Sequence, residues 1–263
     1  MLRVFARDGS RRDMELALLV RVGASVPVPD VLWSGDVLGL PAMLVSHVDG
    51  VLVDAAMAGG SVDDAAPIGR AVGAALADVH QISFAHNGFF DATLTPVGNA
   101  GMGPGQVRAY ADSLLHGGPA GQVLGPELAA AWWQLIDNSA DRLSAVDGQS
   151  RLVHADYNGK NILVRPSPNG WRVSAVLDWE FAFAGPPLVD VGNMLRFLAP
   201  QTFSDSFVDG YRAAGGELVD GWREIAAVLD VFGLVGLLRP GGGLTDRVIG
   251  LVREQAARGR LWP

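Results

Sequence analysis

Polar side chains gather in two short segments in the second half of the chain. The first runs His154-Ala-Asp-Tyr-Asn-Gly-Lys-Asn161, and the second is Asp178-Trp-Glu180. The carboxylate of Asp156 could accept a proton from an incoming hydroxyl group. Asn161 and Asp178 offer an amide oxygen and a carboxylate oxygen, the ligand types that Mg²⁺ prefers. Together these residue types indicate a base beside a Mg²⁺ site, and both are parts of phosphoryl transfer from ATP.

A β-hairpin would bring the two segments together. Residues 151–153 form a short predicted strand that enters the first segment, and residues 162–164 and 171–177 form two further predicted strands. The intervening sequence Pro166-Ser-Pro-Asn-Gly170 is a strong turn signal. Strands joined by such a turn run antiparallel, so we expect Asn161 and Asp178, at the open end of the hairpin, to lie close together.

The spacing of these residues resembles that of one enzyme family. His154, Asp156 and Asn161 match the kinase catalytic loop His-x-Asp-x-x-x-x-Asn. Asp178-Trp-Glu180 is similar to the metal motif that replaces Asp-Phe-Gly in the aminoglycoside phosphotransferase family, which includes choline and homoserine kinases. The segment 185–193 and the helix that ends at His80 resemble further landmarks of this family, and the resemblance spans about residues 2–240.

The resemblance implies a chemical role for four residues. Asp156 would be the catalytic base, and Asn161 and Asp178 would hold Mg²⁺. Glu180 would assist the metal, although it could also be a solvated or structural acid. The implied cofactors are Mg²⁺ and ATP or GTP, and the implied partner is a small molecule that carries a hydroxyl group.

The resemblance also implies the fold. We expect an α+β, two-lobed, protein-kinase-like fold with a truncated N-terminal β-lobe over residues 1–50. A mainly helical C-terminal lobe over residues 51–263 would carry the catalytic loop and the metal-binding hairpin. His154 and Asp190 would brace that loop.

The first 50 residues contain less than a kinase-like N-lobe usually does. They predict one strand at residues 2–5, a helix at 13–22 and a hairpin that leads into a hinge at 45–48. Two further strands and a nucleotide-covering loop are expected before them, so either the chain starts downstream of the natural start or the natural protein lacks that loop. The first strand would present an unpaired edge, which we expect a partner chain or residues 51–65 to cover.

The phosphate-binding Lys of such a lobe has no counterpart here. Lys160, in the catalytic loop, is the only Lys of the chain. Arg3 is the plausible substitute, and Glu15, 12 residues later, resembles its acidic partner, although the two could form an ordinary surface pair. Backbone groups near Ser46 and Val48 would meet the adenine ring.

The remaining sequence predicts helices joined by loops. Residues 83–106 are rich in Gly and Asn and predict an irregular connection. Apolar residues at helical spacing predict the other elements. The predicted helices cover about residues 67–80, 126–146, 188–199, 203–214, 222–238 and 245–259.

Composition excludes several classes of function. The chain has 263 residues, with 28 acidic and 20 basic side chains and a net charge of -8, which argues against a nucleic-acid partner. It has no cysteine, so disulfides and thiol nucleophiles are excluded. Neither a membrane-spanning run nor a signal peptide is evident, so we expect a cytoplasmic protein with no membrane partner. The oligomeric state is left open.

Three function classes follow. The leading prediction is an ATP- or GTP-dependent phosphotransferase that acts on a small molecule, such as an aminoglycoside-like compound, a sugar or an amino alcohol. The alternative is a catalytically weak or inactive kinase-like binding protein, because the nucleotide-covering loop and the usual Lys are absent. A metal-dependent hydrolase is a weaker third class, since the His and Asp clusters of such enzymes are lacking.

Overall fold

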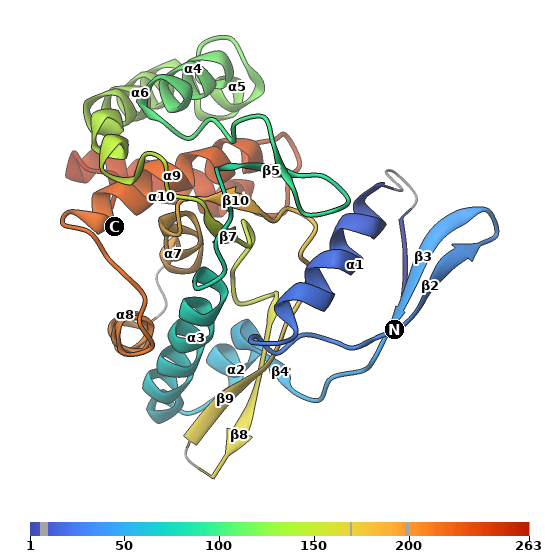
Figure 1. Ribbon diagram of the computed structural model, residues 1–263. Helices are drawn as coiled ribbons and strands as arrows, with labels where there is room; N and C mark the ends of the chain where they lie inside the picture. The colour runs from blue at the N-terminus through green and yellow to red at the C-terminus, as the bar shows by residue number, and fades with distance from the viewer. Residues whose placement is uncertain (6–9, 169, 198–199, 263) are drawn as a thin grey trace.

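The N-terminal part of the chain forms a small antiparallel sheet with one helix. The computed structural model describes residues 1–5, 10–168, 170–197 and 200–262. Strands β1 (Leu2–Val4), β2 (Val31–Val37) and β3 (Leu40–Val45) are ordered β1-β3-β2, and α1 (Ser10–Val22) connects β1 to β2. The β2–β3 hairpin projects from one side of the molecule (Figure 1).

The outer edge of β1 is not covered by residues 51–65. Among the described residues, β1 pairs only with β3. Residues 51–65 instead form β4 (Val51–Leu52), α2 (Val53–Gly59) and the 3₁₀ turn η1 (Val62–Asp64). The prediction that this segment covers β1 is wrong, because β4 uses its backbone groups to pair with β8. The alternative, cover by a partner chain, stays a prediction.

The hairpin that the turn signal predicted is present. Strands β8 (Ile162–Ser167) and β9 (Gly170–Val176) pair antiparallel, with Ile162 opposite Val176. Just beyond this pair, the Leu177 amide donates to the Asn161 carbonyl oxygen at 2.8 Å. The open end of the hairpin therefore brings the two polar segments together.

A second sheet leads into the first polar segment. It consists of β5 (Gly88–Phe90), β6 (Pro96–Val97), β7 (Arg151–Val153) and β10 (Phe183–Gly185), in the order β6-β5-β10-β7. β10 follows the second polar segment and pairs antiparallel with β7, which precedes the first. Residues 154 and 182 are thus attached to neighbouring strands.

Helices make up most of the rest of the structure (Figure 1). The region 83–106 was expected to be irregular, and this is wrong in part, since it holds β5, β6 and the start of α4, where Pro104 occupies the first turn. Residues 198 and 199 of the predicted helix 188–199 lie outside the described residues. The helices are α3 (Ala65–His80), α4 (Pro104–Leu115), α5 (Pro119–Leu124), α6 (Pro126–Ala140), the 3₁₀ helix η2 (Asp141–Val146), α7 (Leu188–Leu195), α8 (Gln201–Ala213), α9 (Trp222–Leu237) and α10 (Thr245–Arg258).

No helix of the described residues is both long and apolar enough to cross a membrane. The division of the chain at residue 50 stays a prediction.

Helices α3 and α8 pack unusually closely because glycines line their contact. A Cβ atom at Gly73 would overlap the carbonyl oxygen of Phe207, and one at Gly210 would overlap the carbonyl oxygen of Arg70. The close approach matters for the site, since α3 ends at His80 and α8 carries Tyr211, and these two side chains form a hydrogen bond of 2.8 Å.

This packing gives a test by substitution. Gly73→Ala should lower the free energy of unfolding by about 2 kcal/mol or more, because α8 must move away, even though Ala is the better helix former. Gly250→Ala is the matched control, since nothing lies within 4 Å of a Cβ there, and it should raise stability by roughly 0.5–1 kcal/mol. Urea unfolding measures both. Equal changes in the two variants would contradict the packing argument.

Candidate functional site

The loop that follows β7 is fixed by one buried carboxylate. Asp190, on α7, is fully buried and accepts hydrogen bonds from the backbone amides of His154 and Ala155, each at 2.8 Å. Its Oδ2 also lies 3.2 Å from Nε2 of His80. Ala155 has a φ of 66°, which costs about 1–2 kcal/mol for a residue with a Cβ. The two amide bonds to Asp190 help to hold this conformation.

His154 joins the loop to the end of the hairpin. Its Nε2 lies 2.8 Å from the Leu177 carbonyl oxygen, and its Nδ1 accepts from the Asp156 amide at 3.2 Å. This pattern requires the neutral imidazole with the proton on Nε2. Burial lowers the pKa of His154, and the neighbouring Asp190 opposes that shift. The ring also packs against Trp179, with centroids 4.6 Å apart. His154 therefore orients the loop from inside the protein.

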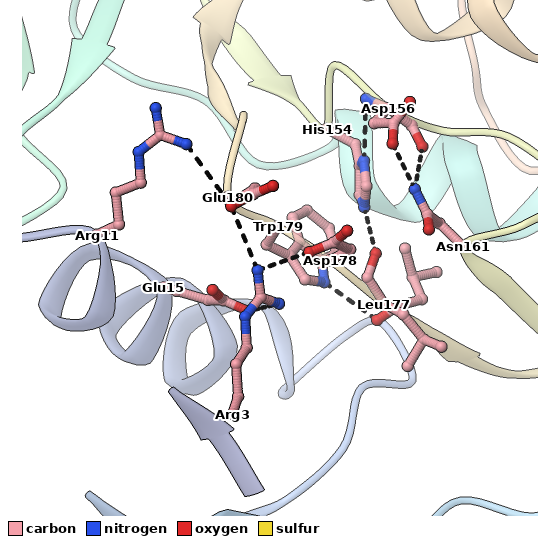
Figure 2. Close-up of polar contacts among 11 residues, drawn as sticks. Arg3, Arg11, Glu15, His154, Asp156, Asn161, Leu177, Asp178, Trp179 and Glu180 are labelled. Carbon is pink, nitrogen blue, oxygen red and sulfur yellow. Dashed lines mark hydrogen bonds and ion pairs between the residues drawn. The ribbon is translucent and has the colours of Figure 1, made fainter. Parts of the chain in front are cut away.

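Two amide side chains orient the carboxylate of Asp156. Asn158 Nδ2 donates to Oδ1 and Asn161 Nδ2 donates to Oδ2, each at 2.7 Å. Asn161 Nδ2 also donates to the Asp156 carbonyl oxygen at 2.9 Å. The amide oxygen of Asn161 thus points away from Asp156 (Figure 2). Each carboxylate oxygen retains a lone pair for a further donor, such as a hydroxyl group.

Asp178 is held in a sharp turn just after β9. Its φ is 65°, a conformation that Asp tolerates better than most residues do. The next residue, Trp179, is fully buried and donates from Nε1 to the Val176 carbonyl oxygen at 3.1 Å. The turn leaves the Asp178 side chain 38% exposed beside the N-terminal sheet.

Arg3 connects β1 to three carboxylates. Its guanidinium lies 2.7 Å from Glu15 Oε1, 2.7 Å from Asp178 Oδ1 and 3.5 Å from Glu180 Oε2. Arg11, on α1, lies 3.6 Å from Glu180 Oε2 as well. Figure 2 shows these side chains converging from β1, α1 and the segment after β9.

Glu15 is the most buried carboxylate of this cluster, with 3% of its surface exposed, and its pKa is shifted by this burial. Burial raises the pKa of Glu15 to about 7, against the lowering effect of Arg3. Asp178 and Glu180 raise it further. Burial, more than the neighbouring charges, therefore makes the Glu15 carboxylate costly to ionise.

The predicted hinge residues, Ser46 and Val48, are not hydrogen-bonded to this cluster among the described residues. Ser46 exchanges two bonds with Asp30, since its amide donates to the Asp30 carbonyl oxygen at 2.8 Å and its Oγ accepts from the Asp30 amide at 2.9 Å. Val48 is half-buried in the same connection between β3 and β4. No hydrogen bond joins either residue to Arg3 or Asp156 within the described part of the chain.

A cavity of about 420 Å³ opens beside Asp156. Its walls come from α2, the loop 156–161, the end of α7, the start of α8 and the segment from α9 to α10. This volume falls within the usual range of small-molecule sites, about 300–1,000 Å³.

Several residues of the site were not expected from the sequence. Asn158 lies within the recognised loop, two positions after Asp156. The sequence therefore showed that it belongs to the loop, but not that its side chain donates a hydrogen bond to Asp156. Arg11 belongs to none of the sequence motifs, so nothing in the sequence indicated its contact with Glu180. Arg196 forms a buried ion pair with Asp230, with Nε 2.9 Å from Oδ2, and it follows directly after α7. These partners are 34 positions apart in the sequence, which explains why the sequence pattern gave no signal.

The donor set around Asp178 fits Mg²⁺. No group of three or more His, Asp or Glu side chains in the described residues is arranged to hold a metal ion by itself. Mg²⁺, however, is usually bound through one or two carboxylates together with substrate phosphates and water. Asp178, Glu180 and the amide oxygen of Asn161, which points away from Asp156, are oxygen donors of this kind.

Comparisons with known proteins establish the family. The pattern of the phosphotransferase enzyme family matches residues 4–228, which is most of the chain, and the chain therefore belongs to this family. Acyl-CoA dehydrogenase family member 11 of Gallus gallus is 28% identical over 177 residues, which are 66% of this chain and 21% of that protein. The chain thus spans about a fifth of the length of the curated relatives it matches.

Solved structures share the kinase-like fold. Aminoglycoside phosphotransferase APH(4)-Ia, in a ternary complex with ADP and hygromycin B, has a TM-score of 0.67 at 20% identity, covering 98% of this chain and 86% of that one. The GDP complex of an aminoglycoside 2'-phosphotransferase has a TM-score of 0.71 at 16% identity, covering 95% and 82%. At these identities the likeness shows a common α+β fold.

The burial of Glu15 predicts a pH dependence of stability. The pKa of Glu15 is about 7 in the folded chain against an ordinary value of 4.5, so between these pH values the folded chain holds a proton that the unfolded chain releases. The free energy of unfolding from this group therefore falls as pH rises from about 4.5 to 7. Relative to Glu15→Gln, which does not titrate, the parent should lose up to about 3 kcal/mol between pH 5 and pH 8.

Denaturant unfolding at several pH values measures this difference. Asp13→Asn, which removes a half-exposed carboxylate from the same helix, controls for the loss of one negative charge. If the Glu15→Gln and parent curves run parallel over this range, Glu15 does not titrate as described.

Proposed function

We propose that the chain transfers the γ-phosphoryl group of ATP or GTP to a hydroxyl group of a small molecule. The observation that supports this most is the carboxylate of Asp156, which two amides hold at the edge of the 420 Å³ cavity. A hydroxyl group bound in that cavity could donate to either carboxylate oxygen. Asp178 lies between Asn161 and Arg3, and Glu180 lies beyond it, beside Arg3 and Arg11 (Figure 2).

The proposed reaction is a single in-line transfer. The acceptor oxygen forms a bond to the γ-phosphorus while the bond from that phosphorus to the bridging β–γ oxygen breaks, and ADP or GDP leaves. The hydroxyl proton passes to the carboxylate of Asp156. Asn158 and Asn161 keep the carboxylate in one orientation, so no side-chain rearrangement precedes the proton transfer.

Asp178, Glu180 and Asn161 would hold Mg²⁺ together with the nucleotide. When bound, the ion would neutralise charge on the phosphate oxygens. Arg3 would contact the phosphates as well, as a planar fork rather than a point charge. The ADP and GDP found in the structural neighbours support a nucleotide in this fold, and the hygromycin B of one neighbour supports a small-molecule acceptor.

One observation favours the second candidate, a catalytically weak or inactive kinase-like binding protein. Arg3 Nη2 lies 2.7 Å from Asp178 Oδ1, so the cation proposed for phosphate and the carboxylate proposed for metal satisfy each other. If this pair persists in solution, nucleotide and metal must displace it. Binding of Mg²⁺ and ATP without turnover of any acceptor would favour this candidate.

The role of Asp156 is tested by Asp156→Asn, which keeps the size of the side chain and removes its ability to take a proton. We expect acceptor-dependent formation of ADP or GDP to fall about 100-fold or more, with folding retained. The assay uses a panel of an aminoglycoside, a sugar, an amino alcohol and a hydroxy acid. Asp209→Asn, at an exposed position on α8, is the control and should leave turnover unchanged. Turnover by Asp156→Asn at the parent rate would exclude Asp156 as the base.

The metal site is tested by Asp178→Asn, because Asn tolerates the left-handed backbone of this residue and removes only the charge. Calorimetry measures the ratio of ATP affinity with Mg²⁺ to ATP affinity without it. We expect this ratio to be at least 10-fold larger for the parent than for the variant. Affinity for ATP without Mg²⁺ should be equal or higher in the variant, since one negative charge is lost near the phosphates. An unchanged Mg²⁺ effect would exclude Asp178 as a ligand.

A further inference from the structure

The cavity beside Asp156 is apolar over much of its wall. Half-buried or buried carbon side chains face it from four helices and the connections between them. They are Met57, Met194, Phe197, Phe203, Leu237 and Leu244. Apolar walls of this kind bind ligands by removing apolar surface from water. A polyhydroxylated, fully solvated acceptor would leave these side chains without apolar partners.

The charged side chains of the cavity are unevenly matched. Arg196 is neutralised by its buried partner Asp230. Asp54 lies against Gly159, next to Lys160, so this edge carries one charge of each sign. Arg247 lies on the aromatic side of the cavity, against Phe197, and no carboxylate of the described residues forms an ion pair with it.

Arg247 is held over an aromatic wall of the cavity. Its guanidinium carbon lies 4.2 Å from the ring centroid of Phe197, at a distance typical of a cation–π contact. The contact orients the guanidinium but leaves its N–H groups free to donate. A fork of donors with fixed orientation binds carboxylates and phosphates well.

We infer that the acceptor is an amphiphilic anion, in which a hydroxyl group and an anionic group share an apolar carbon skeleton, and that Arg247 binds the anionic group. This inference rests on the proposed function and names the substrate class of the same site. The skeleton lies on the apolar wall while the hydroxyl group donates to Asp156. A polycationic acceptor meets Arg247 as a like charge and is disfavoured at that end of the cavity.

The test compares matched acceptors with the intact chain. The probes are hydroxydecanoates with the hydroxyl group at different positions, their methyl esters, glycolate, and kanamycin, and the readout is acceptor-dependent ADP or GDP formation. We expect kcat/KM for the best hydroxydecanoate to exceed that for its ester, for glycolate and for kanamycin by at least 10-fold. Glycolate carries the charge without the apolar skeleton, and the ester carries the skeleton without the charge.

Arg247→Gln separates the proposed contact from a general effect. It should raise KM for the hydroxydecanoate at least 10-fold, leave kcat within 2-fold and leave the ester unchanged. Arg253→Gln removes an exposed charge from the same helix and should alter neither substrate. A preference for kanamycin, or equal effects of Arg247→Gln on acid and ester, overturns the inference while the proposed function stands. If no hydroxyl compound is phosphorylated, both fail.

Discussion

The structure of the site depends on the buried carboxylate of Asp190. It binds the amides of His154 and Ala155 and lies within hydrogen-bond distance of His80, so one side chain of α7 joins the end of α3 to the loop after β7. A carboxyl group with no access to water is tolerated only when hydrogen-bond partners surround it. The packing of α3 against α8 places His80 correctly, and the orientation of Asp156 follows from the loop. The glycines between α3 and α8 are thereby linked, through His80 and Asp190, to the loop that carries the proposed base.

Charge balance is the second constraint. Three carboxylates converge on Arg3, and Arg11 lies near one of them. Burial keeps Glu15 partly protonated near neutral pH, which relieves some of the repulsion among these groups. A divalent cation with a nucleotide would change this balance, since the metal would take over Asp178 and the phosphates would compete for Arg3. The ion pairs of Arg3 can stabilise the free chain. Binding of a metal ion and a nucleotide at the same residues would break some of these pairs.

The sequence predicted those parts of the site that depend on local order. The turn signal at 166–170 places Asn161 and Leu177 side by side, and the loop spacing indicates Asp156. Contacts between distant segments could not be predicted in this way. Asp230 neutralises Arg196 across 34 residues, and Arg247 reaches the cavity from the last helix. Helix α4 was missed because its Gly-rich start resembles a loop, and the position of residues 51–65 was wrong because their pairing with β8 is non-local.

Asn161 must serve two neighbours of the same charge. Its Nδ2 donates to Asp156 at 2.7 Å, and its oxygen points away from Asp156. A carboxylate at this position would lie so close to Asp156 that one of the two groups would have to take a proton, and the base would be lost or the metal ligand weakened. A Lys would satisfy Asp156 but repel a cation. Only a neutral side chain with both a donor and an acceptor would let the proposed base and the proposed metal site lie side by side, and the five-residue spacing from Asp156 brings the amide back to it.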